Sequence, residues 1–341
     1  MRGFFKSPTW ILAGIGLFGS TCCFCQTTQD LVALANADSA YVKKYFLKND
    51  FRLFYGGQGN NLALGSKRDE ETQLNGNLYT NTNDYIGLGI TYQWLDGDLS
   101  FALPGTTYLK EEQSNLTQFK LGISYTQRKL AFRAYYSDSK GIVVSDANDE
   151  FQSEPSLHEV KFGMQIIYLF NASKYSYRAS MYQSEYQLKT AGSFLLRAEP
   201  FYRSLGTNSG SMIPPAYDLS ARFGEQAGLE YIKAPGLLIL PGYGINFVIR
   251  GSRFFVSPIL FAGIGVAQNM YKTTDGKGSF TSVEYAGNFT LNTGYSGNRH
   301  YLKIQLNWSA GYTLLDPTYL TNSNLTVVFM AGIRFSDLKR L

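Results

Sequence analysis

The feature that most constrains this chain is a two-residue alternation of apolar and polar side chains, which recurs along most of its length. Its clearest copy lies in residues 84–104, where the large apolar positions are Ile86, Leu88, Ile90, Tyr92 and Trp94. A period of two is typical of a β-strand with one apolar and one polar face. The alternation resumes beyond Asp96-Gly97, so we predict a hairpin whose tight turn is this Asp-Gly pair.

About thirteen segments of this kind follow one another between residues 51 and 335. Most are around ten residues long, which is the length of a tilted strand that crosses a bilayer. Short turns alternate with longer polar loops, as in outer-membrane barrels. We therefore predict an all-β fold, a single antiparallel transmembrane β-barrel of about 12 strands with a range of 10 to 14.

The strand count leaves one question open. A barrel whose two ends lie on the same side of the membrane needs an even number of strands, so thirteen segments cannot all belong to its wall. Either residues 205–235, which are rich in proline and glycine, hide a further strand, or one assigned strand lies outside the wall. The assigned strands include residues 175–181, which follow a predicted turn at residues 171–173.

The N-terminus has the pattern of a cleaved export signal in residues 1–25. Arg2 and Lys6 precede a nine-residue apolar core, which is too short to cross a bilayer as a helix. Lipidation of a cysteine in residues 22–25 is the less favoured alternative. Residues 26–48 are predicted as a periplasmic helical lead-in, with a plug inside the barrel as the alternative, and residues 49–341 as the barrel.

Composition narrows the classes of function. Net charge is only +5 and no run of Lys or Arg occurs, so we expect no nucleic-acid partner. All three cysteines lie in the predicted signal, which leaves the mature chain without a disulfide or a zinc-cysteine site. No cofactor and no metal site is expected.

No catalytic constellation stands out. The only histidines are His158 and His300. An outer-membrane lipase would need a serine, a histidine and an orienting group in contact, and Ser153 and Ser156 lie near His158 in sequence. We interpret both histidines as loop or rim residues and expect no enzyme.

The polar faces of the strands carry an excess of basic residues. If the apolar faces meet lipid, the candidate charges in the lumen are Lys120, Arg133, Lys161, Arg178, Arg197, Glu199, Glu284, Lys303 and Arg334. One hypothesis is an anion-favouring passage or a site for a small anionic solute, because rings of Lys and Arg select anions. The alternative is a filled interior whose charges pair with one another.

Several stretches resemble a family known only as domain-of-unknown-function family 4421. They are NTNDYIGLGITYQWL, LSFALP, FKLGISY, FRAYYSDSKG, YSYRASMYQSEYQLKTAGSFLL and PGYGINFVI, and the resemblance extends from about Tyr41 to the C-terminus. It implies an outer-membrane β-barrel of Bacteroidota-type bacteria. The partners that we expect for such a barrel are outer-membrane lipid and the barrel-assembly machinery. The resemblance implies no activity. One departure from outer-membrane practice is that SDLKRL follows Phe335 instead of a terminal aromatic residue.

Three classes of function remain open after this reading. The first is an integral outer-membrane barrel without enzymatic activity, acting as a narrow channel, a transporter with a basic lumen or a structural envelope protein. The second is an outer-membrane enzyme acting on lipid or envelope substrates. The third is a secreted ligand-binding barrel whose apolar face is turned inward, a fold for which eight strands would suffice.

Overall fold

The computed structural model describes residues 38–66, 76–80, 84–106, 117–145, 151–207, 210–212, 228–249, 253–314 and 318–336. The predicted signal and residues 26–37 of the predicted lead-in lie outside them. The chain divides into residues 1–36 and residues 37–341, and everything below concerns the second unit. Its long strands are β2 (Asn49–Ser66), β3 (Gly76–Thr80), β4 (Asp84–Tyr92), β5 (Leu95–Ala102), β6 (Thr117–Thr126), β7 (Leu130–Ser145), β8 (Phe151–Leu169), β10 (Ala191–Thr207), β11 (Leu229–Val248), β12 (Phe254–Thr273), β13 (Lys277–Ser296), β14 (His300–Leu314) and β15 (Thr318–Phe335).

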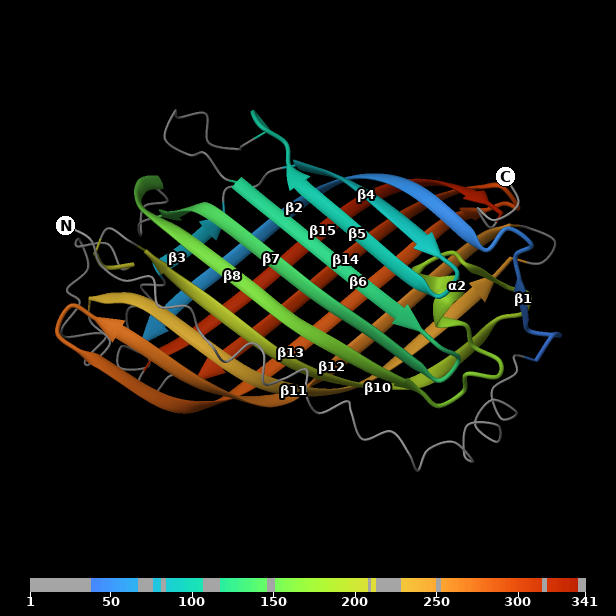
Figure 1. Ribbon diagram of the computed structural model, residues 1–341. Coiled ribbons are helices and arrows are strands. Elements are labelled where there is room, and N and C mark those ends of the chain that lie inside the picture. The colour runs from blue at the N-terminus through green and yellow to red at the C-terminus, as the bar shows by residue number, and fades with distance from the viewer. Residues whose placement is uncertain are drawn as a thin grey trace, which may run out of the picture. The chain divides into compact units, whose positions relative to one another are not determined.

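These strands form one antiparallel sheet that closes on itself (Figure 1). Each strand pairs with its neighbours in the chain, and β15 pairs with β2 along its whole length, from Thr318 with Ser66 to Phe335 with Asn49. β3 and β4 share one place in the wall, because β2 pairs with β3 through residues 60–64 and with β4 through residues 50–57. The described wall therefore has 12 strand positions, which confirms the predicted barrel.

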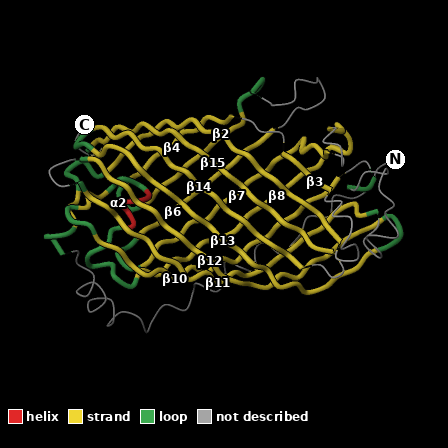
Figure 2. The backbone as a smooth tube through the Cα atoms, turned by 180° about the vertical axis from the view of Figure 1, so that it is seen from behind, coloured by secondary structure: helices red, strands yellow, loops and turns green. Residues whose placement is uncertain are grey.

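The wall begins at Asn49 and finishes at Phe335, and these two residues pair with each other at one end of the barrel, which we call the turn end. Residues 93–94, 127–129, 170–190, 249–253 and 297–299 connect strands there, and the opposite end is the loop end. A second sheet at the turn end consists of two short strands, β1 (Val42–Lys44) and β9 (Glu185–Gln187). Figure 2 shows the short helix α2 (Tyr177–Met181) at the end where the C-terminus lies, and Figure 1 shows β1 at the same end.

The apolar faces of the strands point outward. In β4 the side chains of Ile86, Leu88 and Ile90 are exposed, whereas Tyr85 and Thr91 face the lumen and are buried. Large exposed apolar side chains occur on every long strand whose exposure is described along its length, and Trp94 and Tyr125 pack edge to face at the turn end. This arrangement is the opposite of the inward-facing apolar lining that a secreted ligand-binding barrel requires.

The predicted Asp96-Gly97 turn is wrong. Both residues lie in β5, where Asp96 pairs with Thr91, and the tight turn is Gln93-Trp94, with Gln93 at a φ of +57°. The turn lies three residues before its predicted position because the Asp96 side chain binds Arg52 inside the lumen. A tertiary ion pair thus overrides the local preference of the Asp-Gly dipeptide for a turn.

The strand predicted for residues 175–181 is also wrong. These residues contain α2, which begins after the N-cap Ser176, whose Oγ accepts a hydrogen bond from the Ala179 N–H. The open question of strand number is thereby answered, since this segment lies outside the wall. Residues 205–235 contribute no extra strand to the wall, because β10 and β11 pair directly with each other.

The helix predicted for residues 26–48 does not extend through its described part. Residues 42–44 form β1, which pairs with β9 from residue 187 to residue 185. Val42 and Tyr45 are buried by this docking, so contacts with distant segments override the helical spacing of the sequence. No helix among the described residues has the length and apolar character needed to cross a membrane.

Candidate functional site: a plugged lumen with a polar cavity

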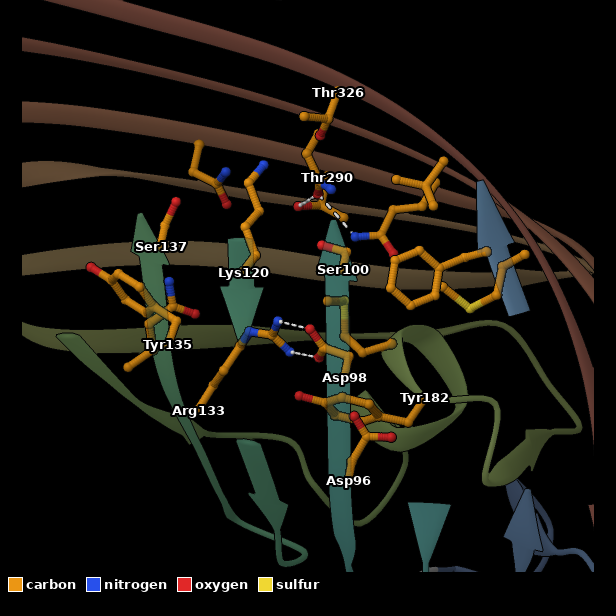
Figure 3. Close-up of a pocket in the computed structure, with 18 of the residues that line it drawn as sticks. Asp96, Asp98, Ser100, Lys120, Arg133, Tyr135, Ser137, Tyr182, Thr290 and Thr326 are labelled. Atoms are coloured by element: carbon orange, nitrogen blue, oxygen red, sulfur yellow. Dashed lines mark hydrogen bonds and ion pairs between the residues drawn. The ribbon is translucent and has the colours of Figure 1, made fainter. Parts of the chain in front are cut away.

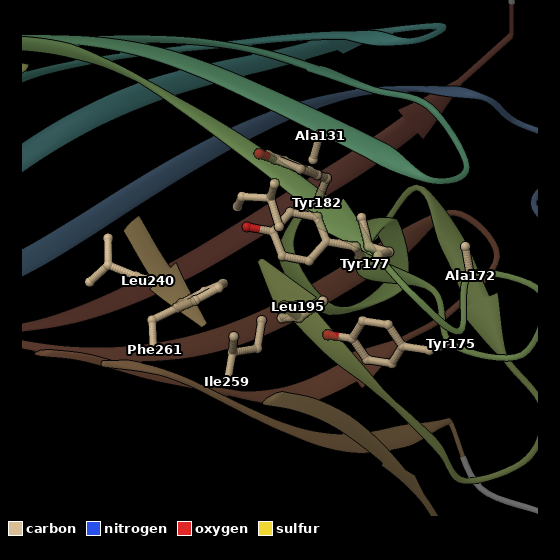
Figure 4. Packing of buried hydrophobic residues seen from close by; sticks show 11 residues of the cluster. Ala131, Ala172, Tyr175, Tyr177, Tyr182, Leu195, Leu240, Ile259 and Phe261 are labelled. Carbon is tan, nitrogen blue, oxygen red and sulfur yellow. The ribbon is translucent and has the colours of Figure 1, made fainter. Parts of the chain in front are cut away.

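Residues 170–190, which we call the plug, fold into the lumen at the turn end. Their aromatic side chains Tyr175, Tyr177 and Tyr182 are buried against inward-facing wall residues (Figure 4). Those wall residues come from five neighbouring strands, β7, β8, β10, β11 and β12. They include Ala131, Ile167, Leu169, Leu195, Leu240, Ile259 and Phe261. The plug therefore brings its own apolar core to an otherwise polar interior.

Basic side chains of the wall hold the backbone of the plug from other directions. Arg334 of β15, which is 4% exposed, donates to the Gln183 carbonyl oxygen at 2.5 Å. Lys303 of β14, which is 3% exposed, donates to the Met181 carbonyl oxygen at 2.7 Å. The Arg334 donor is charged, and charge-assisted hydrogen bonds are about twice as strong as neutral ones.

Further anchors come from the turns and from β11. Arg128 forms an ion pair with the plug residue Glu185 at 3.1 Å. The side-chain amide of Asn246 donates to the Ser176 carbonyl oxygen at 2.9 Å, and Arg178 of the plug donates to the Gln93 carbonyl oxygen, also at 2.9 Å. The plug thus contacts wall strands or their turns around the circumference of the barrel, and it closes the described lumen at the turn end.

The segment between β1 and β2, residues 45–48, packs against the plug from the turn end. The Tyr45 ring lies 3.7 Å from the Arg334 guanidinium carbon, and its hydroxyl contacts Ser296 Oγ at 2.8 Å. Burial raises the pKa of the Tyr45 phenol above its ordinary value, although the charge of Arg334 opposes that rise. Arg334 therefore joins the plug, the N-terminal segment and the β13–β14 turn, whose Gly297 carbonyl oxygen it also binds.

Beyond the plug, the lumen contains a cavity of about 450 Å³ (Figure 3). Its floor includes the plug residues Tyr177, Met181 and Tyr182. Five cations and two carboxylates line it, together with amides and hydroxyls on β13, β14 and β15. The charged residues are Arg52, Lys120, Arg133, Arg197, Lys303, Asp96 and Asp98, and the amides and hydroxyls on those strands are Asn288, Thr290, Gln305, Asn307, Asn324 and Thr326.

Three of the five cations are in ion pairs. Arg52 binds both carboxylate oxygens of Asp96, at 2.6 and 2.8 Å, and its Nη1 also lies 3.4 Å from Asp50. Arg133 pairs with Asp98 at 3.0 Å, and the labelled pair in Figure 3 shows this fork. Arg197 pairs with Glu199 at 3.1 Å.

Glycines make room for the first two pairs. A Cβ at Gly89 would collide with the Arg52 guanidinium, and a Cβ at Gly122 would collide with Arg133 and Asp98. The alternation of glycine with large apolar residues in these strands therefore has a physical cause. The glycines face inward, where the long arginine side chains cross the strand surface.

The other two cations of the cavity have no such partner. Lys120 donates to Gln58 Oε1 and lies 5.1 Å from the centroid of the Tyr85 ring, and Lys303 donates to the plug carbonyl described above. Among the described residues, neither ammonium group forms an ion pair with a carboxylate. The cavity therefore keeps two lysines whose described hydrogen bonds go only to neutral oxygens.

The remaining candidates from the sequence lie elsewhere. Lys161 pairs with Glu159 at 2.7 Å, and Glu284 pairs with Arg203 at 3.3 Å, and neither pair lines the cavity. Arg178 belongs to the plug and not to a wall strand. Sequence reasoning missed Arg52, Asp96 and Asp98. Strand parity could have placed Asp96 and Asp98 in the lumen, because the neighbouring Leu99 and Phe101 occupy the apolar face.

Among the described side chains, none forms a recognisable catalytic group with either histidine. His158 Nε2 lies 2.9 Å from Asp138 Oδ1, which is the geometry of an oriented imidazole. No described nucleophilic side chain contacts His158, and the side chains of Ser153 and Ser156 lie outside the described ones. The described residues also contain no cluster of three or more His, Cys, Asp or Glu that could hold a metal ion.

No curated protein matches the sequence at a significant level. Among solved structures, the outer membrane protease OmpT of Escherichia coli has a TM-score of 0.40 and 10% identity, over 85% of this chain and 98% of that chain. The beta domain of the Bordetella autotransporter BrkA has a TM-score of 0.40 and 10% identity, over 84% and 99% of the two chains. The Pseudomonas putida toluene transporter TodX has a TM-score of 0.31 and 9% identity, over 84% and 90%.

A family model assigns the chain more directly. The model described as "Domain of unknown function (DUF4421)" matches residues 36–335 of the 341. That range contains all of the described wall, the plug and every residue that lines the cavity. The chain belongs to the DUF4421 family.

Proposed function

We propose that this protein is an integral β-barrel of the bacterial outer membrane, with the turn end in the periplasm. The outward apolar face supports this location. On β12 that face extends from Phe254 to Val266. At about 3.3 Å per residue and a tilt of about 40°, these positions span about 30 Å along the barrel axis, the thickness of a hydrocarbon core. The orientation rests on the two ends of the wall, which both lie at the turn end, and on the four short connections there besides the plug, because periplasmic connections are the short ones.

The proposed role is to hold a small anionic solute without transforming it. The observation that carries this proposal is the pair of lysines, Lys120 and Lys303, that have no described carboxylate partner in a cavity that the plug closes on the periplasmic side. Buried cations without a carboxylate partner are costly, so an anion that enters the cavity gains both attraction and hydrogen bonds. A barrel closed in this way also conducts no steady ion current, unlike an open channel.

The rest of the lining narrows the chemistry of the solute. Amides and hydroxyls on β13 to β15 face the cavity, and such groups recognise ligand hydroxyls by hydrogen bonds. The side chains of Tyr85 and Tyr135 add aromatic surface on the other side. A volume of about 450 Å³ lies within the range of small-molecule pockets. The arrangement fits a hydroxylated carboxylate of the size of a sugar acid.

Equilibrium dialysis of the purified protein in neutral detergent, with radiolabelled glucuronate as the probe, tests this function. We expect glucuronate to bind, the neutral sugar glucose to bind at least about tenfold more weakly, and Lys120→Met to weaken glucuronate binding by a similar factor. Lys161→Met is the matched control, because Lys161 is already paired with Glu159 outside the cavity. Equal binding of glucose and glucuronate, or no effect of Lys120→Met, would contradict the proposal.

Location is tested separately from binding. Fractionation of the producing cells should place the protein with the outer membrane, and the folded barrel should migrate differently from the heated one on a gel without prior boiling. Recovery of the protein in a soluble fraction without detergent would refute the membrane assignment.

A further inference from the structure

A second cavity lies at the turn end, outside the plug. Its volume is about 700 Å³, and we call it the basic groove. The chain from β1 to β2 forms one side through residues 43–47. The other side consists of β9 and the residue after it, and of the two turns that contain Arg253 and Arg299. The groove is thus built by segments that are far apart in the sequence.

The described charges of the groove all have the same sign. Lys43, Lys44, Arg253 and Arg299 line it, and no acidic residue of the described chain does. Arg253 is held in place by the Asn298 side-chain oxygen at 2.8 Å and by the Tyr186 ring, whose centroid lies 5.2 Å away. Within the described chain, no carboxylate forms an ion pair with any of the four cations. Four converging positive charges repel one another unless an anion lies between them.

The same groove also presents apolar surface. Phe46 is 88% exposed, and Leu47 and Leu188 line the groove beside it. A phosphate ion would satisfy the cations but would leave these side chains in water. A ligand that carries an anionic head and an apolar tail satisfies both parts of the lining.

The position of the groove favours a ligand from the membrane. Arg253 directly precedes Phe254, the first outward-facing residue of β12, and Ile249 at the other end of the same turn is also exposed. A phosphate bound at Arg253 would therefore be close to the edge of the apolar belt. Arginine and lysine clusters at such an edge are typical sites for anionic lipid head groups.

We propose that the basic groove binds the phosphate head group of an anionic phospholipid, whose acyl chains remain against the apolar exterior. The proposal rests on the outer-membrane location proposed above, with the turn end in the periplasmic leaflet, and is independent of the solute cavity. The lipid would tie the segment between β1 and β2, which covers the plug, to the membrane surface.

Native mass spectrometry of the purified full chain in neutral detergent provides the test. The protein is mixed with phosphatidylglycerol or with phosphatidylcholine, and retained lipid is measured for each. We expect phosphatidylglycerol to be retained preferentially. Lys43→Gln/Lys44→Gln should weaken retention by roughly 30-fold, since each cation near a lipid surface contributes about fivefold. Arg253→Gln/Arg299→Gln should act in the same way.

The matched control removes two lysines at the loop end, Lys140→Gln/Lys277→Gln, both of which are exposed. It should leave lipid retention unchanged, and gel mobility before and after heating verifies that each variant is folded. Equal retention of the two lipids, or the same loss in the control, would overturn the proposal. Competition by inorganic phosphate at the concentration of the lipid would reassign the groove to a free anion. Retention of neither lipid would overturn it too, in favour of a polypeptide occupant.

The result of the lipid experiment can be distinguished from the result of the glucuronate experiment. Glucuronate binding depends on Lys120, which lies in the lumen, and Lys120→Met should not change lipid retention. A failure of lipid binding with intact glucuronate binding would refute only this inference.

Discussion

Replacing Arg334 with methionine should loosen the plug without unfolding the barrel. The arginine donates one charge-assisted hydrogen bond to the plug, at the Gln183 carbonyl oxygen, and its other hydrogen bonds go to the wall. Hydrogen bonds to charged groups contribute about 1.5–3 kcal/mol. Methionine keeps much of the buried volume, so the main effect on the plug is the loss of that bond.

The free energy of plug opening should fall by the same amount. Since about 1.4 kcal/mol corresponds to a factor of ten, the open fraction should rise by roughly 10- to 150-fold. Ser180 in α2 is fully buried in the closed plug, so a thiol placed there by Ser180→Cys reacts with a maleimide only after opening. The three natural cysteines, which are residues 22, 23 and 25, are replaced by serine in this background.

The assay is the rate of maleimide labelling of the folded protein in detergent, with and without Arg334→Met. Arg203→Met is the control, because Arg203 is a buried arginine that pairs with Glu284 and forms no described hydrogen bond with the plug. The control should label at the background rate. A rise of less than threefold for Arg334→Met, or an equal rise for the control, would refute the assignment of Arg334 as an anchor of the plug.

Three further predictions concern the wall and the N-terminal segment. Gly89→Ala should lower the free energy of unfolding, measured by urea titration, by about 1–3 kcal/mol because the added Cβ collides with Arg52. Gly97→Ala should be nearly neutral because the nearest atom to its Cβ is 4.0 Å away, and equal effects of the two substitutions would contradict this packing. An arginine on the lipid-facing surface costs most at the middle of the bilayer, so Leu88→Arg should destabilise the barrel in liposomes by about 2–4 kcal/mol. Ser279→Arg, which is near the loop end, should cost only about 0–1 kcal/mol, and the reverse order would contradict the membrane placement. Because burial raises the pKa of Tyr45, the docking of the segment should be fully stable below the ordinary pKa of 10.0 and should weaken as the pH rises above it. Tyr45→Phe should abolish this pH dependence, which the rate of proteolysis between β1 and β2 measures from pH 9 to 11. An unchanged pH profile in the variant would assign the effect to another group.

The wall of the barrel could be predicted from the sequence because its physics is local. Most strands have one face toward an apolar surrounding and one toward a polar interior, and this difference appears as a period of two in their sequences. Ile86, Leu88 and Ile90 lie on the outward face for this reason. Length, periodicity and the need for an even count predicted about 12 strands within a range of 10 to 14, and the pairing of the strands settles the number.

The plug could not be predicted in the same way. Residues 175–181 also alternate in polarity, although the segment bends into a short helix whose tyrosines contact several strands at once. A segment buried inside a barrel has no lipid face and no single polar face, so its pattern imitates a strand by accident. The turn at Gln93-Trp94 was missed for a related reason, because the Arg52–Asp96 ion pair joins residues 44 positions apart in the sequence.

The cavity was only partly accessible to sequence reasoning. The parity of the strands identifies a basic excess, but it does not say which cations find a carboxylate on another strand. Lys161 pairs with Glu159, which lies two residues away, whereas Lys120 contacts Gln58, which lies 62 positions away. The difference between a paired and an unpaired lysine depends on strand register, and register between distant strands is a property of the closed barrel.

Residues 170–190 close the lumen at the turn end, and this closure can be measured as conductance across a planar lipid bilayer. The protein is reconstituted intact, and beside it a variant in which a short Gly-Ser turn joins β8 to β10. We predict no steady current from the intact protein and a steady, ohmic current from the variant without the plug. A steady current of equal size from both proteins would contradict the closure of the lumen by this segment.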